Sequence, residues 1–431
     1  MEPLLILVIL INTILVFKLF SKKTLIFITG LLPLSQVILI FIRYQILPTD
    51  FEDPTVNFPI SKIDAYNNVF VLSILILLFL VPFLIFIKRS KYSIFNYEFN
   101  EIIALAKHHH LIVTLFASSY PLWVFTQAYM QRSILDYFIS LIVRLFGAAW
   151  LFVPILPFRD KLIVGSIFIS SLPIAIYVGN RTAFIFPLIL LLIYYFLEFA
   201  SKTDQIFSNI KSIFKFFIGS IFVFASLSIF IIISIIIRFN RELKGFDFNA
   251  IISRFFDLDI GNNIFVIAFS ETFDRLIQWQ ILTSLIVDKI SFSRFFNEYI
   301  FIFSSDRYNW DLMMSNEIGL GLVQLMGIDP TPGYSWPVTV LAEGALRFGY
   351  FGLVLFYFLF LVTLIATIEL SKKIYIRNFF TTLYFLTATL INFNADSLPI
   401  YFKTSFQFLI LSFSFLILYK FCFFRLDKRN N

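Results

Sequence analysis

Apolar residues in this chain form long runs separated by short polar joints. A run of about 18–22 residues is long enough to cross roughly 30 Å of hydrocarbon as a helix. Lipid offers the backbone no hydrogen-bond partners, so such runs are expected to be helices and not open strands. They fall near residues 3–18, 24–46, 69–87, 111–130, 138–156, 162–178, 182–199, 214–237, 350–368, 379–393 and 400–420. The pattern predicts an all-α, polytopic membrane bundle of about eleven transmembrane helices, forming one integral membrane domain over 1–431.

The composition agrees with a lipid environment. Hydrophobic residues make up 59% of the chain and charged residues 14%, and the mean hydropathy is +0.87. Soluble domains are about 25% charged. The single cysteine, Cys422, excludes a disulfide framework and a thiolate metal site. A net charge of +7 suggests nucleic acid in a soluble protein, but here it indicates basic cytoplasmic loops, and no nucleic-acid partner is expected.

The joints predict the orientation in the membrane. Lys and Arg gather in alternate joints, such as 18–23, 88–107 and 372–377, and in the tail after Lys420. Cytoplasmic loops carry an excess of these residues, so the C-terminus is expected in the cytoplasm and the N-terminus outside. The stretch 238–337 is then a large extracytoplasmic loop. Its segment 262–290 has the apolar periodicity of an amphipathic helix, so we expect a helical cap.

Several basic residues stand at the predicted outer ends of the spans, where basic residues are disfavoured. They are Arg43, Arg132, Arg144, Arg181, Arg238, Arg241 and Lys403. A cation in or near lipid is costly and seldom lacks a partner. Each one either pairs with a nearby carboxylate or joins a common outer cavity. Planar guanidinium groups that converge in such a cavity would bind phosphate or pyrophosphate by forked hydrogen bonds.

Two motifs lie close to these positions. Gly179 and Asn180 favour a tight turn, which would aim Arg181 across the bundle. In the segment 329–352, DPTPGYSWPVTVLAEGALRFGYFG, an irregular proline-containing stretch leads into a helix. Glu343 and Arg347 stand at i, i+4 on one face of that helix, where they either pair with each other or contribute to a site. The same helix contains three glycines, at 344, 349 and 352, which would allow close helix packing.

Other chemistry is disfavoured by geometry. The histidines are consecutive, at 108–110, and consecutive helical residues point about 100° apart, so they cannot converge on a metal. The Asp257-Leu258-Asp259 tripeptide imitates a metal-binding DxD but lies on the predicted outer side, away from cytoplasmic nucleotide sugars. No Walker loop, Rossmann fingerprint or HExxH occurs. We therefore expect no metal and no cofactor.

The GNRTAF elbow at 179–184, the large loop, and PGYSWPVTVLAEGALRFGYFG at 332–352 together resemble the Wzy-type polymerases of O-antigen and capsule repeat units, which are related to the O-antigen ligases. In that family a Pro-Gly segment leads to a Glu and then to Phe-Gly-x-x-Gly. Phe348, Gly349 and Gly352 have this spacing. The resemblance implies a C-type glycosyltransferase fold in the bacterial inner membrane.

It also implies an inverting glycosyl transfer at the outer membrane face. The substrates would be undecaprenyl-pyrophosphate-linked oligosaccharides, with membrane lipid and a chain-length-regulating co-polymerase as partners. The pyrophosphate would be bound by arginines, and the candidates are Arg144, Arg181, Arg238, Arg241, Arg307 and Arg347. The loop lacks the histidine of the ligases, so a base would be a carboxylate, and the candidates are Asp306, Asp311, Glu317 and Glu343. A flippase of lipid-linked oligosaccharides and an O-antigen ligase remain as alternatives.

Overall fold

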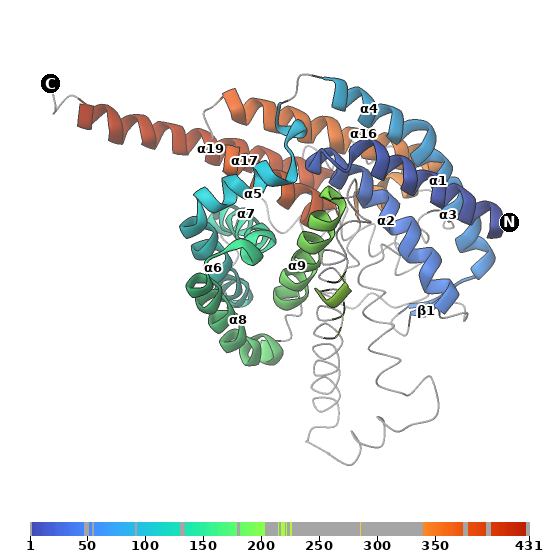
Figure 1. The fold of residues 1–431 in the computed structure, drawn as a ribbon, viewed down its shortest axis with the longest axis horizontal. Coiled ribbons are helices and arrows are strands. Elements are labelled where there is room, and N and C mark those ends of the chain that lie inside the picture. Colours follow the sequence, from blue (N-terminus) through green and yellow to red (C-terminus); the bar gives the residue numbers. More distant parts are fainter. Residues whose placement is uncertain are drawn as a thin grey trace, which may run out of the picture. The chain divides into compact units, whose positions relative to one another are not determined.

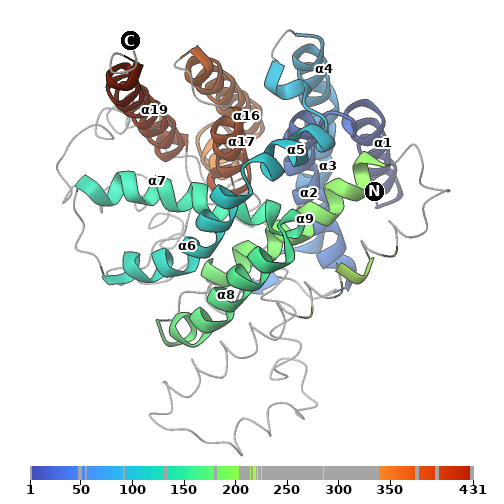
Figure 2. The same ribbon diagram turned by 60° about the vertical axis from the view of Figure 1, so that its left-hand side comes forward.

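The computed structural model describes nine stretches of the chain and a few isolated positions between them. The stretches are 2–46, 51–53, 56–90, 93–129, 134–178, 182–202, 339–373, 378–393 and 398–427, and the isolated positions are 214, 217–219, 221, 225 and 285. These residues are almost entirely helical (Figures 1 and 2). The chain separates into two compact units. The first unit comprises Met1–Phe20, Leu25–Asn96 and Ile277–Asn431. The second unit comprises Ser21–Thr24 and Tyr97–Leu276.

The first unit begins with two apolar helices, α1 (Glu2–Phe20) and α2 (Thr24–Ile46). Gly30 allows α2 to approach its neighbours closely, because a Cβ there would lie 3.0 Å from Leu84 and 3.5 Å from Val16. In α1, the side-chain amide of Asn12 donates a hydrogen bond of 2.8 Å to the Ser73 carbonyl oxygen of α3. Small residues and buried amides are the usual means of helix association in lipid, where burial of apolar surface gives no driving force.

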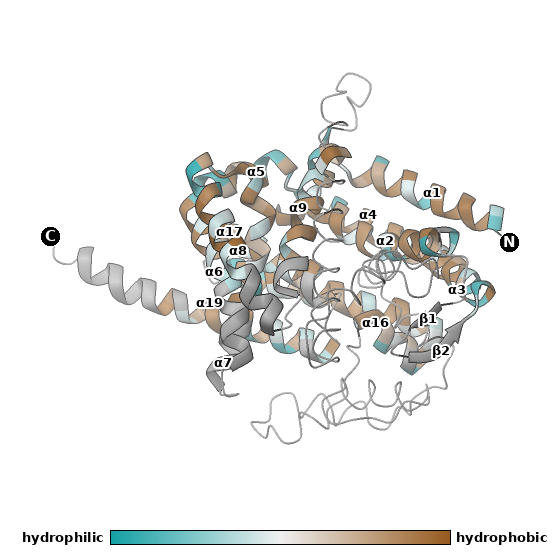
Figure 3. Ribbon diagram, turned by 90° about the horizontal axis from the view of Figure 1, so that it is seen from below, coloured by the Kyte–Doolittle hydropathy of each residue, from teal (hydrophilic) through white to brown (hydrophobic). Residues whose placement is uncertain are grey.

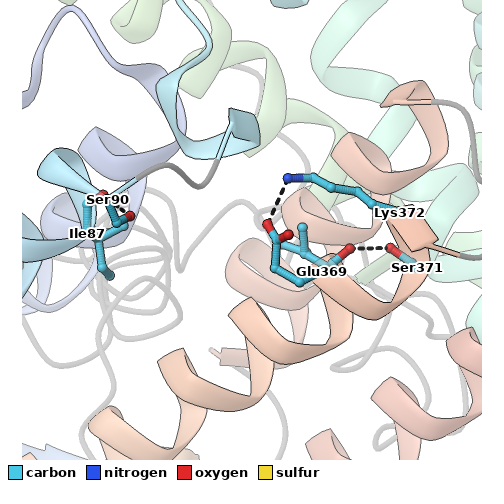
Figure 4. Close-up of polar contacts among 6 residues, drawn as sticks. Ile87, Ser90, Glu369, Ser371 and Lys372 are labelled. Carbon is cyan, nitrogen blue, oxygen red and sulfur yellow. Dashed lines mark hydrogen bonds and ion pairs between the residues drawn. The ribbon is translucent and has the colours of Figure 1, made fainter.

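A single helical rod follows over Lys62–Arg89. It consists of α3 (Lys62–Leu75), a π-helical segment (Ile76–Leu80) and α4 (Val81–Arg89). The rod begins at Ser61, whose hydroxyl accepts the Asp64 N–H at 3.1 Å and so satisfies one of the free donors of the first turn. It ends at Ser90, whose hydroxyl bonds to the Ile87 carbonyl oxygen at 2.5 Å (Figure 4). The predicted span 69–87 lies within this rod.

A short hairpin precedes the rod and departs from the predicted all-α fold. Strands β1 (Phe51–Asp53) and β2 (Val56–Ile60) pair antiparallel, with Phe51 opposite Ile60 and Asp53 opposite Val56. The apolar pattern predicts no element between the runs 24–46 and 69–87. Alternation over so few residues is too short to stand out beside the long apolar runs, and Pro59 counts against a strand by propensity.

Three further helices lie in the described residues of the C-terminal part of the first unit. They are α16 (Val340–Lys373), α17 (Asn378–Leu386), which continues as a π-helical segment (Thr387–Asn392), and α19 (Leu398–Asp427). Aromatic side chains pack where these helices meet: the rings of Tyr384 and Phe408 stack at 4.0 Å, and those of Phe360 and Tyr401 lie 4.5 Å apart. The Tyr357 hydroxyl donates a hydrogen bond of 2.5 Å to the Thr29 carbonyl oxygen and so connects α16 to α2.

The second unit is built around α6 (His110–Tyr129). Its other described elements are α5 (Phe99–His108), α7 (Ile134–Ala148), a 3-10 segment (Ala149–Ile155), α8 (Phe158–Val178) and α9 (Thr182–Ser201). The Trp150 indole N–H donates to the Ala117 carbonyl oxygen at 3.0 Å, which fixes the 3-10 segment on α6. The Thr114 hydroxyl donates to Asp160 at 3.1 Å and connects α6 to α8.

Four helical stretches among the described residues are long and apolar enough to cross a membrane. They are Glu2–Phe20, Thr24–Gln45, Lys62–Arg89 and Arg347–Lys372. Figure 3 shows hydrophobic residues along most of α1, with hydrophilic colour at its N-terminal end. Helix formation is confirmed for the predicted runs that lie in the described parts. The total of about eleven spans, the single domain over 1–431 and the extracytoplasmic loop 238–337 stay predictions.

Candidate functional site

A buried helical arm in the first unit contains two of the predicted site residues. The arm begins at Val340, and the Thr339 hydroxyl caps it by accepting the Ala342 N–H at 3.3 Å. It ends at Gly349, whose φ of 61° and ψ of −140° interrupt the helical backbone of α16. Residues 339–345 are all buried. We call Val340–Phe348 the arm, and the rest of α16, from Tyr350 to Lys373, the long segment.

The break at Gly349 folds the arm back along the long segment. Gly344 and Gly352 lie backbone against backbone, because a Cβ on either glycine would collide with the carbonyl oxygen of the other. In a continuous helix these residues would stand about 12 Å apart along the axis. The predicted close packing of these glycines is confirmed. The reversal at Gly349 was not predicted, because a helical hydrophobic pattern continues through it.

Glu343 and Arg347 form an ion pair inside this fold. Arg347 Nε lies 3.3 Å from Glu343 Oε1, and the side chains are 1% and 0% exposed, respectively. This pairing is one of the two outcomes that the i, i+4 spacing allowed. The second carboxylate oxygen, Oε2, accepts the Leu398 N–H at 2.9 Å, from the first residue of α19. Glu343 therefore connects two elements that are 55 residues apart in the chain.

A second arginine, Arg43, is buried in the same unit. It lies in the last turn of α2, is 4% exposed, and its guanidinium carbon lies 5.2 Å from the centre of the Tyr44 ring. Arg43 is one of the basic residues at the predicted outer ends of the spans, and the sequence predicts no specific role for it. The rings of Tyr44 and Tyr66 contact each other edge to face at 6.1 Å.

Tyr350, directly after the break, donates its hydroxyl to the Asn68 side-chain oxygen of α3. Neither Tyr350 nor Asn68 was singled out from the sequence, because an aromatic residue and an amide at helix ends are common in membrane proteins. Through this bond the start of the long segment is attached to the first turns of the Lys62–Arg89 rod.

An apolar cavity of about 60 Å³ adjoins the arm. Leu341 of the arm lines it together with Leu353 and Tyr357 of the long segment and residues of α2, α3, the π-helical segment and α4. Phe79 and Phe358, which also line it, are 53% and 45% exposed on the surface of the first unit. The cavity therefore connects the neighbourhood of the arm with an exposed apolar surface.

Arg144 belongs to the second unit. It is half-buried on α7, and its guanidinium is close enough to act electrostatically on the hydroxyl of Tyr120 in α6. Gly147, one turn later, allows this approach, since a Cβ there would lie 2.9 Å from the Tyr120 ring. Tyr120 is therefore a polar neighbour of Arg144 within the predicted span.

The remaining predicted site residues lie outside the described residues. They are Arg181, Arg238, Arg241, Asp306, Arg307, Asp311 and Glu317. The structure thus brings together Glu343 and Arg347, and adds Leu398 to them. No group of three or more His, Cys, Asp or Glu side chains able to hold a metal occurs among the residues that the structure describes.

The long apolar helices and the polar groups buried between them place the chain in the class of α-helical membrane proteins. Comparison with known proteins gives no match to a family model, to a curated protein or to a solved structure.

Proposed function

We propose that this protein polymerises lipid-linked oligosaccharide repeat units at the outer face of a bacterial cytoplasmic membrane. The donor would be a growing glycan on undecaprenyl pyrophosphate, and the acceptor a new lipid-linked repeat. The proposal rests on the resemblance of residues 332–352 to the repeat-unit polymerases. The structural observation that favours it is the buried arm, in which this same segment presents Arg347 beside Glu343.

The reaction needs a group that stabilises a departing diphosphate. An acceptor hydroxyl oxygen forms a bond to the anomeric carbon, and the bond from that carbon to the pyrophosphate oxygen breaks with inversion. The negative charge that develops on the leaving group is best stabilised by preorganised cations in a site with little water. Arg347 has the low exposure that strengthens such an interaction. The hydroxyl proton passes to a carboxylate, for which Asp306, Asp311 and Glu317 are the proposed candidates.

The substrate also needs access from the lipid. Its polyprenyl chain stays in the bilayer while the pyrophosphate reacts, so a polymerase requires an apolar path from the lipid to the anion site. The cavity lined by Leu341, Phe79 and Phe358 is an apolar space next to the arm, and its chemistry suits a polyprenyl chain. A flippase would need the same binding chemistry. The two functions must therefore be distinguished by whether new glycosidic bonds form.

The test is reconstitution of the full-length protein in liposomes with a synthetic lipid-linked repeat unit as the only substrate. We expect a ladder of longer lipid-linked glycans and release of undecaprenyl pyrophosphate. Arg347→Lys retains the charge and loses the planar fork, so we expect a strong loss of product. Movement of the repeat across the bilayer without new glycosidic bonds would identify a flippase. In a second assay with lipid A core added, transfer only to that acceptor would identify a ligase.

A further inference from the structure

The helix α1 and the helical rod that contains α3 and α4 lie side by side and run in the same direction. At their first ends, the Gln45 side-chain amide donates to the Glu2 carboxylate and, at 3.0 Å, to the Tyr66 hydroxyl. At their last ends, the Lys88 ammonium donates to the Leu19 carbonyl oxygen. Figures 1 and 2 show α1 and α4 as neighbours. Both helices are long and apolar enough to cross a membrane, so their last ends reach the same membrane surface.

The charged residues of these two helices are divided unequally between the ends. The first ends have two carboxylates and one cation, which are Glu2, Asp64 and Lys62. The last ends, over the described residues of α1 and α4, have three cations and no carboxylate; the cations are Lys18, Lys88 and Arg89. Lys18 adjoins Leu19, and Arg89 adjoins Lys88. The bond between Lys88 and Leu19 therefore gathers the three cations in one place.

These three cations are exposed and can accept a further partner. The side chains of Lys18 and Arg89 make no ion pair or hydrogen bond with any residue that the structure describes. Lys88 is held in place by the Leu19 carbonyl oxygen, one of the last carbonyls of α1, and its Nζ lies 5.9 Å from the centre of the Phe20 ring. An ammonium has three N–H donors, so two of them remain for an acceptor outside the protein.

On each helix an exposed apolar stripe leads to one of these cations. Residues three or four positions apart share a helix face. On α1 the exposed face consists of Leu4, Leu7, Ile11, Ile14 and then Lys18. On the rod it consists of Phe79, Pro82, Phe86 and then Arg89. A phospholipid has the same order of groups along its length, apolar chains followed by a charged headgroup.

We propose that the last ends of α1 and α4 bind an anionic glycerophospholipid. Its phosphate lies among Lys18, Lys88 and Arg89, and its acyl chains lie on the apolar stripes. Three cations without a carboxylate in these helix ends complement an anionic headgroup better than a zwitterionic one, which has an ammonium of its own. The basic joints predict that this end faces the cytoplasm, and the cytoplasmic leaflet has the negative surface potential. The inference is independent of the proposed polymerase function.

Native mass spectrometry of the full-length protein, released from a neutral detergent, tests the headgroup preference. Dioleoyl phosphatidylglycerol and dioleoyl phosphatidylcholine are added in turn. A cation beside an anionic lipid contributes about a fivefold change in affinity, so the three cations predict a preference for phosphatidylglycerol of roughly a hundredfold. Lys18→Gln and Arg89→Gln should each reduce this preference about fivefold, and the double variant about 25-fold. Both side chains are exposed, so these changes should not disturb folding.

The matched control is Lys62→Gln, which removes a cation from the first end of the same rod and should leave the preference unchanged. Equal binding of the two lipids by the wild-type protein would overturn the proposal. An unchanged preference in the double variant would overturn it as well, as would an equal loss in Lys62→Gln.

A competition experiment separates a lipid headgroup from a free phosphate. Glycerol 3-phosphate and inorganic phosphate have the charge without the acyl chains, so neither should displace phosphatidylglycerol at millimolar concentration. Displacement by either would identify a site for a soluble phosphate and would overturn the assignment to a lipid. Ile14→Ser combined with Phe86→Ser retains the cations and interrupts both stripes, so it should weaken binding of the dioleoyl lipid. Wild-type binding by this variant would refute the placement of the acyl chains.

Discussion

The contact between Gly344 and Gly352 leaves no space for a side chain. We predict that Gly352→Ala destabilises the protein by about 2–3 kcal/mol or more, because the added Cβ meets a carbonyl oxygen of the backbone, which cannot move aside as a flexible side chain can. Unfolding of the purified protein in detergent, followed by heat or by steric trapping, measures the change. Polymer synthesis should fall together with stability, since the arm depends on this contact.

Gly165 provides the control for this substitution. It lies within α8, and a Cβ there would meet nothing within 4 Å. Gly165→Ala should therefore be neutral or stabilise the helix by up to about 1 kcal/mol. If both alanine variants changed the stability equally, the close approach of the two glycines would be wrong.

The sequence predicts some residue contacts and not others, for a physical reason. Glu343 and Arg347 are one helical turn apart, so their pairing follows from local geometry. The Glu343–Leu398 bond depends on how the chain returns through α17, and no local pattern encodes that path. Gly349 was expected to aid packing. Its positive φ is a backbone conformation that the amino-acid sequence alone does not reveal.

At the scale of elements, a buried amide connects α1 to its neighbour. Asn12 is fully buried in this apolar helix, and its bond to the Ser73 carbonyl oxygen connects α1 to α3. We predict that Asn12→Ala weakens the association of α1 with the rest of the unit by about 1 kcal/mol, as is usual for a hydrogen bond between membrane helices. A disulfide cross-linking equilibrium between α1 and α3, measured in detergent, reports this change.

Thr13 serves as the matched control for Asn12. Its hydroxyl donates to the Ile9 carbonyl oxygen of its own helix at 2.8 Å, so it makes no contact between helices through this bond. Thr13→Ala should leave the cross-linking equilibrium unchanged. An equal loss in the two variants would mean that helix propensity, and not the Asn12 bond, determines the effect.

Elements were predicted most reliably where the apolar pattern is long. The helices α1, α2 and α16 follow directly from runs of apolar residues. The π-helical segments at Ile76–Leu80 and Thr387–Asn392 were not predicted, because one extra residue per turn hardly changes a pattern that is apolar on all sides. The β1–β2 hairpin was missed because its strands are short.

For the molecule as a whole, orientation in the membrane is the central prediction, and the Lys62–Arg89 rod offers a direct test. Asp64 and Arg89 are exposed at its two ends. In a Cys422→Ser background, an impermeant maleimide should modify Asp64→Cys in intact cells, and Arg89→Cys only after the membrane is opened. The reverse pattern would invert the topology, and modification of both from outside would show that the rod does not span.

Ser371 would be a poor reporter for the same purpose. It follows Glu369 near the end of α16, is fully buried, and donates its hydroxyl to the Ile368 carbonyl oxygen at 2.8 Å (Figure 4). A cysteine there would resist labelling on either side of the membrane. The basic residues around Ser371 predict an accessible position at the membrane surface. The side chain is nevertheless buried, because α16 packs against its neighbours there.

The reversal at Gly349 has a consequence for biosynthesis. The arm is too short to cross the bilayer, and its glutamate and arginine emerge from the ribosome well before α19. At about 5–20 residues per second, the 55 residues between Glu343 and Leu398 delay their contact by roughly 3–11 s. During that interval the Glu343 carboxylate lacks one of its two partners. The arm therefore gains its contact with α19 only after the start of that helix has been made.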